Sequence, residues 1–142
     1  MRVQAILFVA AGALLTLSCS SVRPMAIHDG DQCFRCRRPI AEKAMAAEMM
    51  DGTFASKFRA PGCMAKYLAE HPQETGTTFV TDYATGKWVR PDKALFVPVV
   101  LNRNTGETDY HAFVNKTDAD AAAAESHTVP VDWPTVLKNA RS

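Results

Sequence analysis

Hydrophobic and polar positions repeat along residues 44–125 in a way that predicts two similar successions of elements. Apolar side chains alternate with others on both sides of the turn dipeptide Asp51-Gly52, which predicts a hairpin of two short strands within residues 44–58. Pro61 then stands where a helix over residues 62–70 would begin, a position at which its missing N–H donor costs nothing. The pattern therefore predicts a strand–strand–helix unit.

A second unit of the same kind is expected further along the chain. The apolar run at residues 94–101 predicts a buried strand with an irregularity or an edge position at Pro98. Residues 110–114 are expected to pair back as another strand, and an alanine-rich helix should follow over residues 117–125. A β-branched strand at residues 77–81 lies between the units.

These elements place the chain in the α+β class, as two strand–strand–helix units packed as one small domain. The length of 142 residues and the 47% hydrophobic content suffice for a single core without help from disulfides.

Residues 1–18 have the features of a secretory signal peptide. An uncharged apolar run follows Arg2 and is too short to remain in a bilayer as a spanning helix. It ends in Thr16-Leu17-Ser18-Cys19, which resembles the lipobox of bacterial lipoproteins, where cleavage precedes the cysteine and its sulfur takes a lipid. We expect lipidation of Cys19, a polar tether at residues 19–32, and a lipid-anchored location on the cell membrane or outer membrane, facing the periplasm. The alternative is ordinary cleavage that leaves Cys19 as a free thiol.

Charge gives no reason to expect a nucleic-acid partner. The 16 basic side chains include Arg2, so removal of residues 1–18 leaves basic and acidic side chains in equal number, with 15 acidic. A lipid anchor would supply the contact with the membrane.

Sulfur atoms are the most informative chemistry in the sequence. Cys33 and Cys36 form a Cys-x-x-Cys pair, and Cys63 and Met64 follow about thirty residues later, at the predicted start of a helix. Thiolate and thioether ligands together favour Cu(I) over hard cations. The candidate metal ligands are therefore Cys33, Cys36, Cys63 and Met64.

The surroundings of the cysteines predict thiolates. Arg35, Arg37 and Arg38 crowd the pair, and nearby cations lower a thiol pKa. Cys63 near a helix N-terminus should be affected in the same direction by the helix dipole. Arg37 directly after Cys36 excludes c-type haem attachment, and no second Cys-x-x-Cys or paired histidines favour structural zinc.

Three functions are compatible with this sulfur set. The first is a Cu(I)-binding metallochaperone, which is not an enzyme, whose partner is an apo-cuproenzyme or a copper-transport protein. The second is a thiol-disulfide oxidoreductase that uses Cys33 as attacking thiolate and Cys36 as resolving thiol. The third is a structural lipoprotein with paired cysteines and no metal.

The sequence resembles the NosL family of copper-binding periplasmic lipoproteins, which are linked to the assembly of nitrous-oxide reductase. The matching pieces include the lipobox cysteine, the Cys-x-x-Cys pair and Gly62-Cys63-Met64, and they extend to Thr81-Asp82, Gly86-Lys87-Trp88, the segment 93–97 and Ala112-Phe113. The resemblance implies a NosL-like domain over residues 33–142 and Cu(I) held by Cys and Met sulfurs for delivery to a partner. The chain departs from the family at Arg37 and Arg38, where Gly and Met are usual, and in residues 102–109, which lack a family methionine.

Overall fold

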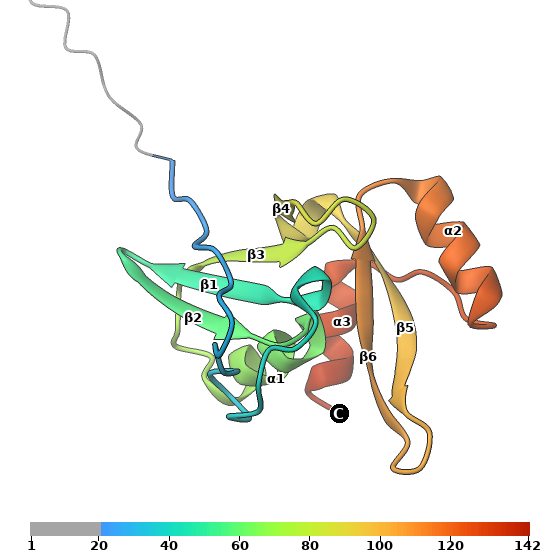
Figure 1. Cartoon of the computed structure of the whole chain (residues 1–142), viewed down its shortest axis with the longest axis horizontal. Coiled ribbons are helices and arrows are strands. Elements are labelled where there is room, and N and C mark those ends of the chain that lie inside the picture. Colours follow the sequence, from blue (N-terminus) through green and yellow to red (C-terminus); the bar gives the residue numbers. More distant parts are fainter. Residues whose placement is uncertain (1–20) are drawn as a thin grey trace, which may run out of the picture.

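A computed structural model describes residues 21–142 (Figure 1), and its helices and antiparallel strands confirm the α+β class. Residues 1–20, with the predicted signal peptide and Cys19, lie outside the described residues. In Figure 1 a sheet lies on the left, a long hairpin lies on the right, and α1 and α3 lie between them. No helix in the described part of the chain is long and apolar enough to span a bilayer.

The first predicted unit is present and forms most of a four-stranded sheet. β1 (Ala47–Asp51) and β2 (Phe54–Phe58) make the hairpin around Gly52, and α1 (Pro61–Glu70) follows. β3 (Thr77–Thr81) pairs with the other edge of β1, and the short β4 (Trp88–Val89) pairs with β3, which gives the order β2-β1-β3-β4. A 3-10 helix, η1 (Lys43–Met45), precedes β1, so the first strand starts later than expected.

The second predicted unit is also present. After η2 (Pro91–Lys93), β5 (Leu95–Asn102) and β6 (Glu107–Phe113) form a separate two-stranded sheet. Pro98 is tolerated because its missing N–H lies on the edge of β5 that faces away from β6, where the bridge to Val131 is made two residues earlier, at Phe96. α2 (Lys116–Glu125) follows, with its start capped by the Asn115 side chain, which accepts hydrogen bonds from two backbone N–H groups.

A third helix lies in the C-terminal segment, for which the sequence pattern predicts no element. α3 (Trp133–Ala140) packs against α1 and β5. A local signal for it is nevertheless present: the Asp132 side chain caps the helix by accepting from Thr135 N–H, and Pro134 lies in the first turn. Val136, Leu137 and Ala140 complete the core on that side.

The predicted tether is attached to the domain over much of its length. We call residues 21–32 the strap; it has no helix and contacts β1 and β2. Met25 N–H donates to Glu48 Oε1 at 2.7 Å, and Lys57 Nζ donates to the Ala26 carbonyl at 2.8 Å. Glu48 is fully buried, and burial raises its carboxyl pKa.

Candidate metal centre

The turn that carries Cys33 and Cys36 is a small hydrogen-bonded loop fixed to the sheet. Cys33 N–H donates to the Arg38 carbonyl at 2.8 Å, and Arg37 N–H donates back to the Cys33 carbonyl at 2.9 Å. Phe34 N–H donates to the Lys57 carbonyl at 2.7 Å, which ties the loop to β2. These hydrogen bonds therefore fix the positions of Cys33 and Cys36 relative to β2.

The start of α1 brings Cys63 to this loop. Pro61 occupies the first turn, as predicted, but Ala60 at the N-cap provides no side-chain acceptor. The Asp109 carboxylate of β6 takes that role instead, because it accepts from Gly62 N–H at 2.7 Å. A Cβ on Gly62 would lie 2.7 Å from Asp109 Oδ1, so only glycine allows this approach.

The three cysteines converge into one cluster. The Sγ atoms of Cys33, Cys36 and Cys63 all lie within 4.8 Å of one another, and all three are free thiols. With metal–sulfur bonds of about 2.3 Å, a linear pair needs sulfurs about 4.6 Å apart and a trigonal set needs about 4.0 Å. The cluster can therefore hold a metal ion with little movement.

One of the three thiols is set up as a thiolate. The Cys33 pKa falls from 9.0 to about 4, chiefly because the Cys63 thiol donates a hydrogen bond to it. The backbone N–H groups of Cys36 and Arg59 also stabilise the charge, against the effect of burial. The Cys63 pKa is raised for the reciprocal reason, so this pair shares one proton and Cys63 keeps it.

These causes differ from those predicted from the sequence. Arg35 pairs with Glu70 at 2.6 Å, and Arg38 pairs with Glu107. Arg37 lies over the Phe34 ring, 5.5 Å from its centroid. The largest contribution to the Cys33 pKa is thus a neighbouring thiol rather than the arginines, and the helix dipole does not make Cys63 the thiolate.

Burial separates the sulfur ligands by access. Cys33 is 0% exposed and Cys63 is 7% exposed, whereas Cys36 is half-buried and reaches solvent. Met64 is fully buried in the same apolar cluster as Cys33 and Cys63. Its place in the core is clear, and its role as a thioether ligand stays a prediction.

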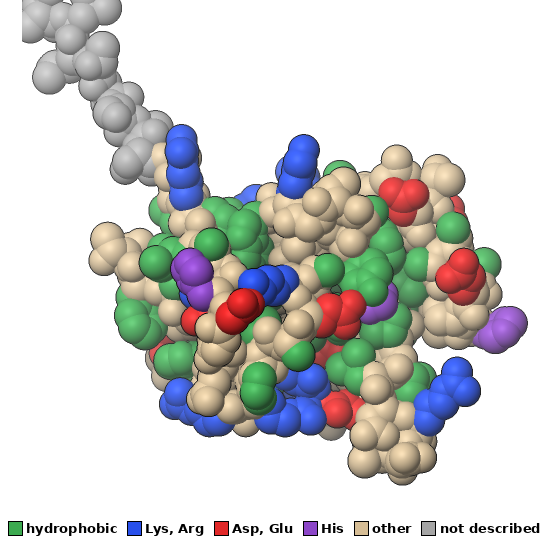
Figure 2. Space-filling model, in the orientation of Figure 1, with side chains coloured by type: hydrophobic (Ala, Val, Ile, Leu, Met, Phe, Trp, Pro, Cys, Tyr) green, Lys and Arg blue, Asp and Glu red, His purple; other side chains and the backbone are tan. Residues whose placement is uncertain are grey.

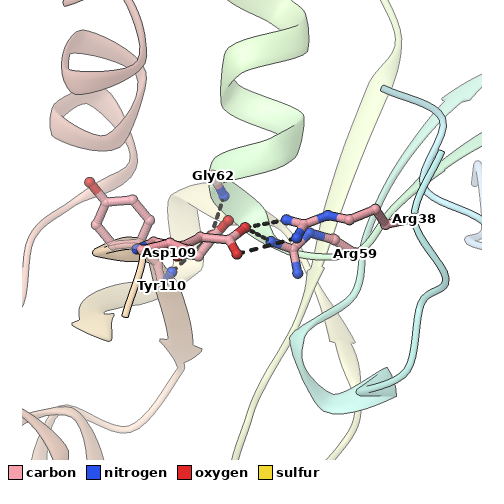
Figure 3. Close-up of polar contacts among 7 residues, drawn as sticks. Arg38, Arg59, Gly62, Asp109 and Tyr110 are labelled. Atoms are coloured by element: carbon pink, nitrogen blue, oxygen red, sulfur yellow. Dashed lines mark hydrogen bonds and ion pairs between the residues drawn. The ribbon is translucent and has the colours of Figure 1, made fainter. Parts of the chain in front are cut away.

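Sequence reasoning missed the acidic residues that support the site. Figure 3 shows Arg38 and Arg59 extending toward the strand that carries Asp109, whose carboxylate turns to the Gly62 N–H. Both arginines form ion pairs with Glu107 of β6, and Asp109 also accepts from Tyr110 N–H at 2.8 Å. No spacing rule connects these residues, because they meet only through the packing of β6 beside α1.

A cavity outside the candidate metal centre lies away from the thiols. It measures about 650 Å³ and is lined by residues of the second unit, including Phe113 and His111. His111 stacks on Tyr83 with ring centroids 3.7 Å apart, and burial lowers its pKa. It is not part of the cysteine cluster.

No protein-family model matches the chain, and no curated protein matches it significantly. The cysteine cluster is therefore the main guide to what this chain can do.

Proposed function

We propose that this chain is a lipid-anchored Cu(I)-binding protein, related to the NosL family, that carries copper to an apo-cuproenzyme or a copper-transport protein. The observation that supports it most is the convergence of Cys33, Cys36 and Cys63 within 4.8 Å. The thiols come from two segments that are far apart in the sequence. A Cys-x-x-Cys pair that only formed a disulfide would need no third cysteine from another segment.

The donor set favours Cu(I) over other ions. Structural zinc takes four ligands, whereas the cluster offers three thiols, and Cu(I) prefers soft sulfur donors. The Asp109 carboxylate, which is close enough to Cys63 to affect its pKa, is already engaged by the N–H groups of Gly62 and Tyr110. Met64 is the candidate fourth donor, and a thioether suits Cu(I) as well.

Access to the cluster supports delivery rather than storage. Cys36 is the thiol that reaches solvent, so a sulfur ligand of a partner can approach beside it and take over the ion by ligand exchange. Cys33 and Cys63 would hold the ion from the buried side.

The oxidoreductase alternative fits the burial less well. A disulfide reductase needs its low-pKa thiolate at the surface, where it can attack a substrate disulfide. Here the low-pKa thiolate belongs to Cys33, which is 0% exposed, while the accessible sulfur is Cys36. We therefore propose a binding protein and not an enzyme.

Anaerobic titration of reduced protein with Cu(I), against a competing chromophoric chelator, tests the proposal. The full chain with Cys19→Ser should retain one ion per chain. Cys33→Ser and Cys63→Ser should each weaken retention at least about tenfold, or about 1.4 kcal/mol.

Two controls make the result decisive. Each variant must keep an unfolding midpoint close to that of the parent, because a collapsed core would mimic a lost ligand. Met64→Leu preserves the buried volume and removes only the thioether, so it asks separately whether Met64 binds. Turnover of a disulfide substrate without copper retention would decide for the oxidoreductase.

The location is tested by metabolic labelling with a fatty acid. The label should enter through Cys19 and disappear in Cys19→Ser, together with membrane association. A Cys19→Ser protein that keeps its label would contradict the lipid anchor.

A further inference from the structure

Basic side chains gather around the accessible edge of the cysteine cluster. We call this set the basic rim; it comprises Arg35, Arg37, Arg38, Arg59 and Lys66. Figure 2 shows Lys and Arg side chains together along the lower edge of the molecule, where Figure 1 places the loop before β1.

The residues of the basic rim lie close to the sulfur atoms of the cysteine cluster. Arg35, Arg37 and Arg38 lie within two residues of Cys36 on the same loop. The Arg59 backbone N–H donates to the Cys33 sulfur, and Lys66 follows Cys63 by three residues on α1. The cations thus lie within electrostatic reach of the thiol that a partner must approach.

Acidic residues cancel only part of this charge. The rim holds five of the 16 basic side chains, and the carboxylates around it are Glu70, Glu74, Glu107 and Asp109. Arg37 and Lys66 form no ion pair within the described part of the chain. Burial raises the pKa of Asp109, which weakens its part in the balance. The formal charge of the whole chain is only +1, so the gathering of cations at the rim does not reflect an excess of basic residues in the chain as a whole.

An apolar patch completes the surface. Phe54 is 59% exposed at the start of β2, and its ring meets that of Phe34 edge-on with centroids 6.2 Å apart. Arg37 covers the other part of Phe34. An exposed aromatic side chain next to arginines is a composition enriched at protein interfaces.

We propose that the basic rim, with Phe34 and Phe54, docks a partner protein that presents carboxylates around its own exposed sulfur ligand. This partner class rests on the proposed function, since it is the sulfur ligand that would receive the ion. Opposite charge around the two sulfurs speeds encounter and orients Cys36 toward the incoming ligand.

A metal-free reaction tests the docking surface independently of copper. The probes are two cysteine peptides of equal length, activated as 2-thiopyridyl disulfides, one flanked by glutamates and the other by lysines. The Cys36 thiolate attacks the peptide sulfur and a mixed disulfide forms. Pyridine-2-thiolate leaves with the electron pair of the broken bond and takes a proton from water to give pyridine-2-thione. Its absorbance gives the rate. The full chain with Cys19→Ser is used, and Cys36→Ser should abolish the fast reaction.

We expect the glutamate peptide to react at least about tenfold faster than the lysine peptide at low ionic strength, and the ratio to shrink toward one in high salt. Arg37→Gln/Lys66→Gln removes two exposed cations of the rim for which the described residues show no ion pair. This variant should lose most of the preference. Lys87→Gln/Lys93→Gln is the matched control, because it changes the net charge equally at exposed positions on either side of β4.

Equal rates for the two peptides, or a faster lysine peptide, would overturn the proposal. So would an equal loss of preference in the control variant, which would trace the effect to overall charge. Failure to retain Cu(I) would leave these rates unchanged, so the two proposals fail separately.

Discussion

The two strand–strand–helix units share the same order of elements, but their helices bury different kinds of side chain. In the first, α1 buries Cys63, Met64 and Tyr67 against the sheet. In the second, α2 buries only Ala119 and Ala123 against its hairpin. The helix of the first unit therefore buries large and chemically active side chains, while the helix of the second unit packs through small ones.

The second unit nevertheless supports the first. β6 supplies Asp109, which caps α1 at Gly62, and Glu107, which holds Arg38 and Arg59. α1 has a Pro and a Gly in its first turn but no cap of its own, whereas α2 carries its own cap at Asn115. The first unit and the loop before it thus carry the thiols, and the second unit fixes the helix that presents Cys63.

The largest effect that separates the units is expected in the titration of the buried thiol. Cys33 should remain a thiolate down to pH about 4, and its ultraviolet absorbance should vanish below that value. Cys63→Ala should raise this pKa by several pH units, because the hydrogen bond that stabilises the thiolate is lost. Cys63→Ser is the matched control, since a hydroxyl still donates.

The same titration fixes the sign of the pH dependence. Unfolded chain binds a proton at Cys33 below pH about 9, and folded chain does so only near 4. The contribution of this group to stability is complete above pH 9 and is lost as the pH falls toward 4. Absence of a thiolate absorbance transition near pH 4 would contradict the assignment.

Truncation of α1 should cost more than any change in α2. Met64→Ala is expected to lower the free energy of unfolding by about 2–5 kcal/mol, since the side chain is fully buried in the main core. Denaturant unfolding measures it. Met64→Leu should cost less than about 1.5 kcal/mol. A Met64→Ala loss below that of the leucine variant would show that α1 is not central to the core.

The contact between Asp109 of β6 and the start of α1 can be tested by adding a side chain at Gly62. Gly62→Ala should cost about 1–3 kcal/mol, because the new Cβ meets the Asp109 carboxylate at 2.7 Å. In an Asp109→Ala background the same substitution should cost much less, which a double-mutant cycle would reveal. Strictly additive losses would rule out the clash as the cause.

The smallest effect is expected in α2. Ala123→Gly should cost about 1 kcal/mol, which is the intrinsic helix penalty of glycine. The exposed Ala121→Gly serves as a matched control at the same cost. If Ala123→Gly costs several times more than Ala121→Gly, packing of α2 matters more than the contrast between the units implies.

Local patterns predicted most elements, and long-range contacts account for the rest. Pro61 and the Asp51-Gly52 turn located α1 and its hairpin correctly. The alternation around Met49 suggested a strand with one buried face, but β1 is buried on both, because the strap covers the face that holds Glu48. Strap contacts of this kind have no periodic signal.

The candidate site was predictable in its residues but not in its chemistry. The three cysteines could be named because thiols are rare and their spacing is informative. The shared proton between Cys33 and Cys63 depends on a contact between two segments, and so does the Asp109 cap at Gly62. The arginines near the cysteines suggested an electrostatic cause for the low pKa. Arg35 and Arg38 are instead paired with the carboxylates of Glu70 and Glu107, which largely offset their charge.

The attachment of the strap has a geometric consequence for a lipid at Cys19. The domain is first fixed at Met25, whose N–H is bonded to Glu48. Six residue steps extend at most about 20 Å, so a lipid at Cys19 would keep Met25 within that distance of the anchored residue. With such an anchor, the edge that carries the cysteine cluster would stay close to the bilayer, and a protein that binds this edge would have to lie at the same membrane surface.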